Sequence, residues 1–256
     1  MDRRECGFIS MSDRKIPLNE RIIFALDVDS PDTAKKWVEM LERYIGFYKV
    51  GLQLFLAGGF PVVDWIIGRG HKVMVDLKFF DVPETVKLAV RQLNNRGITL
   101  ATVHGNDSII RAAVEARDGV AILAVTVLTS FGEEDMREMG MTRPVEDLVH
   151  YRSRRAVELG CDGIVCSALE AARLRTDLGS DFLIVTPGIR PAVKGEIGRD
   201  DQKRVATAKQ AVLNGADYVV VGRPVSRAED PVAVVQALQA EIKEAVKVSA
   251  PFGVTS

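Results

Sequence analysis

Aspartate and lysine residues follow the first three apolar runs of the chain, where a reaction could use their opposite charges. The first run ends in Asp27, the second contains Lys49, and the third continues into Asp76 and Lys78, with Asp81 close behind. Alternate residues of a strand point to one side, so Asp76 and Lys78 are expected on the same face. Three aspartates and two lysines carry a net charge of −1. Such a cluster is costly to desolvate and perturbs pKa values, as functional sites do.

Glycine and arginine recur together after the last two apolar runs. Gly188 lies two residues before Arg190, and Gly222 directly precedes Arg223. Exposed backbone N–H groups beside a guanidinium group favour phosphate binding, and the loops after strands seven and eight are a recurring phosphate site in barrels. Helix-ending glycines next to solvated arginines are the alternative interpretation. The pattern indicates a phosphorylated small molecule whose reacting part faces the aspartates and lysines.

Few other residues have side chains that could take part in a reaction. Thr129 and Ser130 follow the fifth run and could hydrogen-bond a polar ring, although alone they are typical of ordinary loops. The chain has three histidines and three cysteines; only His104 follows a strand, and a structural or solvated role suits it better. The odd number of cysteines fits reduced thiols in a cytoplasmic protein, and their spacing matches neither a redox nor a zinc motif. Chemistry is therefore expected from Asp and Lys.

The elements that must position these residues alternate along the chain. Eight apolar runs without polar alternation are typical of strands covered on both faces. They are 22–26, 47–50, 73–75, 100–103, 120–127, 163–165, 182–185 and 218–221. Amphipathic segments separate them, as after Ser30-Pro31, which is typical of a helix start. With 256 residues, this order predicts an α/β fold, a single (β/α)8 TIM barrel. A doubly wound sheet would want GxGxxG after the first strand, and none is there.

The barrel is expected over residues 21–246, between a flexible N-terminal arm (1–20) and a C-terminal tail (247–256). Met11 is a possible alternative start. The longest irregular stretch, 187–202, has the length of a lid or binding loop, with a surface excursion as the alternative. No run approaches the roughly 20 apolar residues of a membrane span, and the first residues lack the apolar centre of a secretory signal.

The overall charge is balanced. Lys and Arg number 34 and Asp and Glu number 35, which gives a formal net charge of −1. No excess of positive charge is available for nucleic acid or an anionic membrane, so neither is expected as a partner.

One segment is specific enough to resemble a known family. The stretch 76–85, DLKFFDVPET, matches the D-x-K-x-x-D-[IV]-P-x-T motif of orotidine 5′-monophosphate decarboxylases. The pieces ALD (25–27), KVG (49–51), VLTS (127–130), PGIR (187–190) and VGRP (221–224) follow in the family's order. The resemblance extends over about residues 21 to 245. It implies decarboxylation of orotidine monophosphate to UMP and CO2 without a metal or organic cofactor.

The resemblance also implies roles for individual residues. Lys78 would protonate the pyrimidine carbon that loses CO2, Asp76 would lie beside the substrate carboxylate, and Lys49 and Asp81 would complete the charge network. The substrate-binding residues would be Asp27 and Lys49 at the ribose, Thr129 and Ser130 at the pyrimidine, and Arg190, Gln202, Gly222 and Arg223 at the phosphate. Gln210 is a less favoured alternative to Gln202. Family members are dimers, so Asp81 and Thr85 would serve the site of the partner subunit.

Two competing interpretations remain. Related hexulose-phosphate synthases and ketogulonate-phosphate decarboxylases share D-x-K-x-x-D, but resemble one another in binding Mg²⁺ through a Glu at the end of strand two. Here that position is Lys49, which disfavours a metal-dependent reaction. A noncatalytic barrel that binds nucleotides is the other interpretation, disfavoured because both catalytic charges are present.

Overall fold

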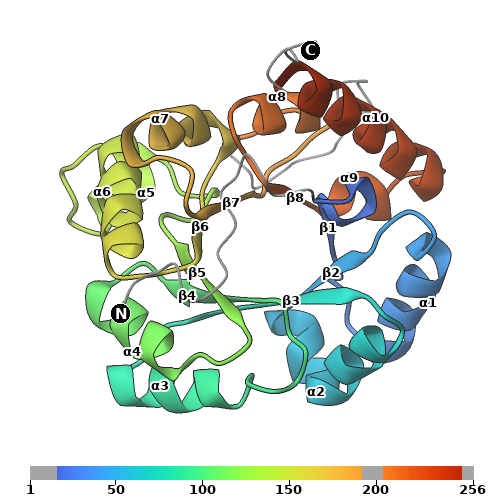
Figure 1. Cartoon of the computed structure of the whole chain (residues 1–256), viewed down its shortest axis with the longest axis horizontal. Helices are drawn as coiled ribbons and strands as arrows, with labels where there is room; N and C mark the ends of the chain where they lie inside the picture. The colour runs from blue at the N-terminus through green and yellow to red at the C-terminus, as the bar shows by residue number, and fades with distance from the viewer. Residues whose placement is uncertain (1–15, 192–203, 250–256) are drawn as a thin grey trace, which may run out of the picture.

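The computed structural model describes residues 16–191 and 204–249, and its eight parallel strands close into a barrel in chain order (Figure 1). The strands are β1 Ile22–Ala25, β2 Phe47–Gly51, β3 Lys72–Phe79, β4 Leu100–His104, β5 Ala121–Val125, β6 Gly163–Val165, β7 Leu183–Thr186 and β8 Tyr218–Val221. The barrel closes where Ile22 of β1 pairs with Val219 of β8. The predicted (β/α)8 barrel is confirmed.

Helices surround the barrel and connect its strands (Figure 1). They are α1 Pro31–Leu41, α2 Leu52–Gly68, α3 Pro83–Arg91, α4 Asp107–Ala116, α5 Glu133–Glu138, α6 Val145–Glu158, α7 Ala168–Leu178, α8 Ala208–Leu213, α9 Arg223–Ser226 and α10 Pro231–Ser249. The predicted start of α1 is confirmed: the Ser30 hydroxyl accepts the Thr33 N–H, and Pro31 occupies the first helical position, where its missing N–H costs nothing.

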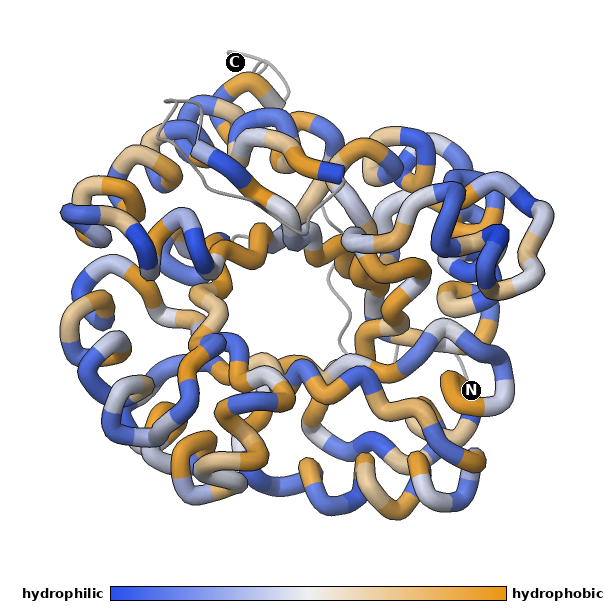
Figure 2. Tube along the Cα trace, turned by 180° about the vertical axis from the view of Figure 1, so that it is seen from behind, coloured by the Kyte–Doolittle hydropathy of each residue, from blue (hydrophilic) through white to orange (hydrophobic). Residues whose placement is uncertain are grey.

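The strands have continuous apolar sequences because they contribute to two apolar layers, one on each face. Ile23, Phe47, Met74 and Leu123 belong to the layer inside the barrel. Residues of the opposite strand face join the helices in a larger core. In Figure 2 the inner ring is mostly hydrophobic, while the surrounding helices alternate between hydrophobic and hydrophilic positions. Because both faces are covered, apolar residues are needed at successive strand positions.

The structure describes part of the predicted arm and part of the predicted tail. Within the predicted arm, Leu18–Glu20 forms a 3-10 helix, and the Asn19 carbonyl accepts the Gly46 N–H at 2.8 Å. Residues 1–15, with Met11, lie outside the described residues. Helix α10 extends to Ser249, and most of the predicted tail lies beyond the described part. Within the described part, no helix is both long and apolar enough to cross a membrane.

Strand β3 departs most from the sequence prediction. It continues four residues beyond the apolar run 73–75, through the expected strand end at 76–78 to Phe79, and its register against β4 shifts between Val75 and Phe79. Lys78, within the irregular part, has a φ of +48°, which is uncommon for a residue with a side chain. Hydropathy alone could not predict this extension because the added residues include Asp76 and Lys78. The strand thus carries charged residues into the site.

Candidate active site

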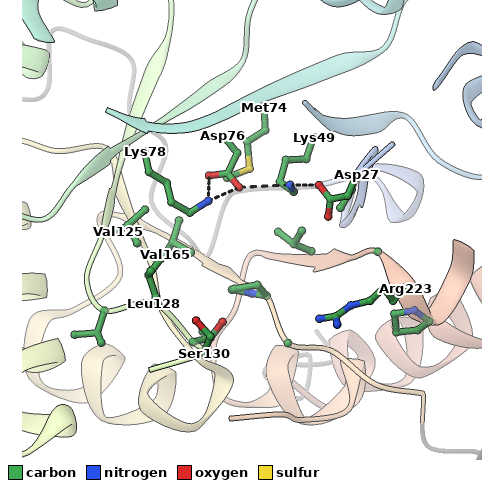
Figure 3. A pocket seen from close by; sticks show the side chains of 18 of the residues that line it. Asp27, Lys49, Met74, Asp76, Lys78, Val125, Leu128, Ser130, Val165 and Arg223 are labelled. Atoms are coloured by element: carbon green, nitrogen blue, oxygen red, sulfur yellow. Dashed lines mark hydrogen bonds and ion pairs between the residues drawn. The ribbon is translucent and has the colours of Figure 1, made fainter. Parts of the chain in front are cut away.

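A pocket of about 260 Å³ opens at the carboxyl ends of the strands (Figure 3). Its polar lining includes Asp27, Lys49, Asp76, Lys78, Thr129, Ser130, Arg190 and Arg223. Apolar residues complete it, among them Met74, Val125, Val165 and Val220. The carboxyl ends of barrel strands are where barrel enzymes place their active sites.

Four charged side chains, here called the Asp/Lys network, form a chain along one wall of this pocket (Figure 3). Lys49 Nζ lies 2.9 Å from an oxygen of Asp27 and 3.5 Å from an oxygen of Asp76. Lys78 Nζ lies 3.0 Å from Asp76. Asp27 follows β1, Lys49 belongs to β2, and the other two belong to β3. Two carboxylates and two ammonium groups give the network no net charge, in place of the −1 expected with Asp81 included.

Burial and ion pairing have opposite effects on the pKa values of groups in the network. Burial by itself lowers the pKa of Lys49, but the carboxylates of Asp76 and Asp27 outweigh it and raise that pKa above its ordinary value. Burial likewise favours the neutral acid form of Asp76, but Lys49 and Lys78 lower the pKa of its carboxyl group. Both groups are therefore charged at neutral pH. The side chain of Lys78 is 35% exposed, against 10% for Asp76, so the ammonium group is open to the pocket.

The fully buried Thr102 of β4 supports the Asp/Lys network, and sequence reasoning missed it. Its buried hydroxyl donates to Asp76 Oδ1 at 2.8 Å and accepts the backbone N–H of Lys78 at 3.0 Å. One hydroxyl therefore holds both the carboxylate and the irregular backbone that presents the lysine. The available signal was a threonine inside the otherwise apolar run Leu100–Val103.

The opposite side of the pocket carries the predicted arginines. Arg223 faces the Asp/Lys network from across the pocket (Figure 3). Arg190 also lines the pocket, and its backbone N–H donates to the carbonyl of Ala206 at 2.9 Å. The backbone of Gly222 lies close to Ala25 and Asp27. A Cβ added to this glycine would lie 3.3 Å from the Cβ of Ala25 and 3.6 Å from Asp27 Oδ2. The two predicted glycine–arginine segments thus lie at one pocket.

Thr129 and Ser130 line the same pocket from the loop after β5 (Figure 3 labels Ser130). The strand ends at Val125, two residues before the predicted end, and a bend at Val127 and a turn at Thr129 and Ser130 follow it. The Thr126 hydroxyl donates to the carbonyl of Val165, and the Thr126 carbonyl accepts from Arg152 of α6 at 2.6 Å. The residues that follow can therefore face the pocket.

Other predicted residues are not brought to this pocket. Among the described residues, the pocket lining includes neither Asp81 nor Thr85; both are exposed, and Asp81 accepts the Val82 N–H at 2.6 Å. Gln202 lies outside the described residues, as does most of the predicted 187–202 loop. Gln210 lies on α8, donates to Asn214, and does not line the pocket. His104 contacts Asn106 at 2.8 Å.

The fold and the site define a TIM-barrel protein with a small-molecule pocket that combines a lysine–carboxylate wall with two arginines. The model of the Orotidine 5′-phosphate decarboxylase / HUMPS family matches residues 20–238. The chain belongs to this family.

Relatives of the chain carry a consistent name. An orotidine 5′-phosphate decarboxylase of Methylococcus capsulatus is 49% identical over 91% of this chain and 96% of its own length. One from Rhodopseudomonas palustris is 47% identical over 88% of this chain and 96% of its own length. The crystal structure of orotidine 5′-phosphate decarboxylase from Lactobacillus acidophilus superimposes with a TM-score of 0.75 at 34% identity, covering 87% of this chain and 99% of that one.

Proposed function

We propose that the protein decarboxylates orotidine 5′-monophosphate to UMP and CO2, the last step of de novo UMP synthesis. The observation that carries the proposal is the Asp/Lys network on the wall of a pocket, in a chain whose relatives are named orotidine 5′-phosphate decarboxylases. The reaction breaks one C–C bond, and its electron pair stays on the pyrimidine carbon. The site must stabilise that charge and then supply a proton.

Lys78 is the proposed proton donor. Its ammonium group lies 3.0 Å from Asp76, faces the pocket and is partly exposed. An ammonium group can stabilise the developing carbanion and then transfer a proton from Nζ to the carbon, which leaves a neutral amine that water reprotonates. Asp76 holds Lys78 in place and is proposed to lie beside the substrate carboxylate. Repulsion between the two carboxylates would be relieved when CO2 leaves.

The rest of the pocket is proposed to bind the nucleotide. Asp27 and Lys49 offer an acceptor and a donor for ribose hydroxyls, and Thr129 and Ser130 offer hydrogen bonds to the pyrimidine edge. Arg190, Gly222 and Arg223 are proposed to bind the phosphate together with Gln202. Contacts to a phosphate remote from the reacting carbon can be used to organise the site for the transition state.

A homodimer is proposed, in which Asp81 and Thr85 enter the site of the partner subunit. Asp81 lies between β3 and α3 and Thr85 lies in the first turn of α3, and neither lines the pocket of its own chain. Exposed apolar side chains lie beside them in the sequence: Phe80 is 67% exposed and Val82 is 63% exposed. Clustered exposure of this kind is typical of an interaction surface.

The proposal includes no metal ion and no organic cofactor, because Lys49 stands where the Mg²⁺-dependent relatives resemble one another in having a Glu. It also places the protein in the cytoplasm. Cys161 and Cys166 are free, buried thiols, and burial raises the pKa of Cys161 to about 12. Such unreactive reduced thiols suit a reducing compartment.

Purified protein incubated with orotidine monophosphate and EDTA tests the reaction through the loss of orotate absorbance. Turnover that persists in EDTA is expected. Absence of turnover would contradict the proposed activity, and turnover abolished by EDTA would favour the metal-dependent relatives.

Mixed subunits test the shared site. Lys78→Ala and Asp81→Ala chains are each expected to have little activity as homodimers. Mixing them should restore roughly a quarter of the wild-type activity, since half of the dimers are mixed and each has one intact site of two. No recovery after verified subunit exchange would contradict the contribution of Asp81 to the partner.

A further inference from the structure

Arg204, which follows the segment outside the described residues, contacts a loop that lines the pocket. Its Nη2 donates to the carbonyl of Leu128 at 3.0 Å and to that of Val127 at 3.4 Å. These two residues directly precede Thr129 and Ser130, and all four line the pocket. Arg204 itself is not among the lining residues. Its side chain therefore acts on the loop backbone from behind the pocket.

The other end of the guanidinium group is bound to a helix. Nη1 of Arg204 donates to Oε1 of Glu170, in the first turn of α7. Both side chains are largely buried, at 13% and 9% exposure. Burial raises the pKa of the Glu170 carboxyl group more than Arg204 lowers it. Buried ion pairs in general add little net stability because desolvation offsets their attraction, so we assign the value of this pair to the geometry that it fixes.

The backbone near Arg204 is joined to the arginine side of the pocket. Ala206 pairs with Ile189 in a parallel bridge, and its N–H donates to the carbonyl of Gly188 at 3.3 Å. Gly188 and Arg190 line the pocket. One short segment, 204–206, thus contacts the loop after β7 through its backbone and the loop after β5 through the side chain of Arg204.

We propose that Arg204, held by Glu170, is a positioning residue that sets the place of Thr129 and Ser130 against the pyrimidine. The inference rests on the proposed function, because it assigns the base to these two residues and the phosphate to the arginine side. Planar guanidinium suits the role since it presents separate N–H groups to Glu170 and to the carbonyls, which a lysine ammonium cannot match in geometry. Arg204 touches no reacting atom.

Two ligands that differ in the base distinguish positioning from general damage. Calorimetric titration of Arg204→Gln with UMP should show affinity weaker by about tenfold, the scale of one lost charge-assisted hydrogen bond. Ribose 5-phosphate, which lacks the pyrimidine, should bind within about twofold of wild type, a change well below that scale. Arg204→Lys should recover part of the UMP affinity, and Glu170→Gln should show a smaller loss in the same direction.

Arg173→Gln is the matched control, because Arg173 lies on the same helix as Glu170 and makes exposed ion pairs with Glu146 and Asp177. It should bind both ligands as wild type does. Equal losses for UMP and ribose 5-phosphate in Arg204→Gln, or unchanged UMP affinity, would overturn the inference, with thermal melting showing that the variant is folded. Wild-type protein that binds UMP without turnover would overturn the proposed reaction and leave the positioning role intact.

Discussion

Buried ion pairs occur at both ends of the barrel, and they are built differently. At the amino ends of the strands, Asp217 Oδ2 accepts the Ile184 N–H and the Arg175 guanidinium, each at 2.8 Å. Asp162 Oδ2 similarly accepts the Ile122 N–H at 2.8 Å and pairs with Arg117 at 3.2 Å. Each aspartate thus joins the start of one strand to its neighbour and to an arginine.

At the carboxyl ends, the charged groups of the Asp/Lys network contact one another along the wall of a pocket. Asp76 accepts from Thr102 and Lys78, and Lys78 is more exposed than the carboxylate that it pairs with. A carboxylate bound to a neighbouring backbone fixes strand pairing, whereas an ammonium group at a pocket remains available to a ligand. Aspartates therefore join strands and arginines at one end of the barrel, and at the other end they hold lysines that are proposed to serve the reaction.

Among the variants that compare the two ends of the barrel, Asp76→Ala is expected to have the largest effect, and that effect is on activity. The change removes the shared partner of Lys49 and Lys78, so both ammonium groups lose their fixed positions. The rate constant for decarboxylation should fall by at least about 10²-fold, the scale of losing one preorganised electrostatic group. Steady-state kinetics on orotidine monophosphate measure it, and a loss of less than a few-fold would contradict the account of the network.

Asp217→Ala should separate the two ends of the barrel. It removes a buried partner of Arg175 and of the Ile184 N–H, so the free energy of unfolding should fall by about 3 kcal/mol. Denaturant titration measures that change. At a temperature where the variant is folded, its kcat should match wild type. A loss of kcat as large as that of Asp76→Ala would show that the amino end also serves the chemistry.

The pH dependence of stability sharpens the comparison. The pKa of Asp76 is lowered from 3.8, so its stabilising contribution is complete above that value and lost as pH falls through the folded-state pKa. The pKa of Lys49 is raised from 10.5, so its contribution is complete below that value and lost as pH rises further.

The difference in unfolding free energy between wild type and Asp76→Asn should therefore be constant from about pH 5 to 9 and shrink in stronger acid. Urea titrations across this range measure it. A difference that changes between pH 6 and 8 would contradict these assignments.

Gly51→Ala is expected to have the smallest effect. An added Cβ would lie 3.1 Å from Lys49 Nζ and 3.3 Å from Asp27 Oδ1, so this ion pair would have to shift by a few tenths of an ångström. Its φ of −95° suits alanine, which excludes backbone strain. The KM for orotidine monophosphate should rise by only about threefold, because the displacement of the ion pair is small. An unchanged KM would show that the pair tolerates the shift.

The sequence predicted the barrel well because the apolar runs suit strands covered on both faces, and it located the network because its charged residues lie within or shortly after the first three runs. It also predicted that Asp76 and Lys78 share a face. Other features depend on tertiary structure. The bulge at Lys78 requires the Thr102 hydroxyl from the next strand, and the loop after β5 is held by Arg152 and Arg204, both far away in sequence. No local pattern reports such contacts.

Lys78 is proposed to deliver the proton, and Lys78→Ala tests this role most directly. Turnover of orotidine monophosphate should fall by about 10³-fold or more, within the range expected for loss of a general acid. Binding of UMP, measured by calorimetry on the same preparation, should remain measurable, because the arginine side of the pocket is untouched. A Lys78→Ala protein that decarboxylates at the wild-type rate would contradict the account.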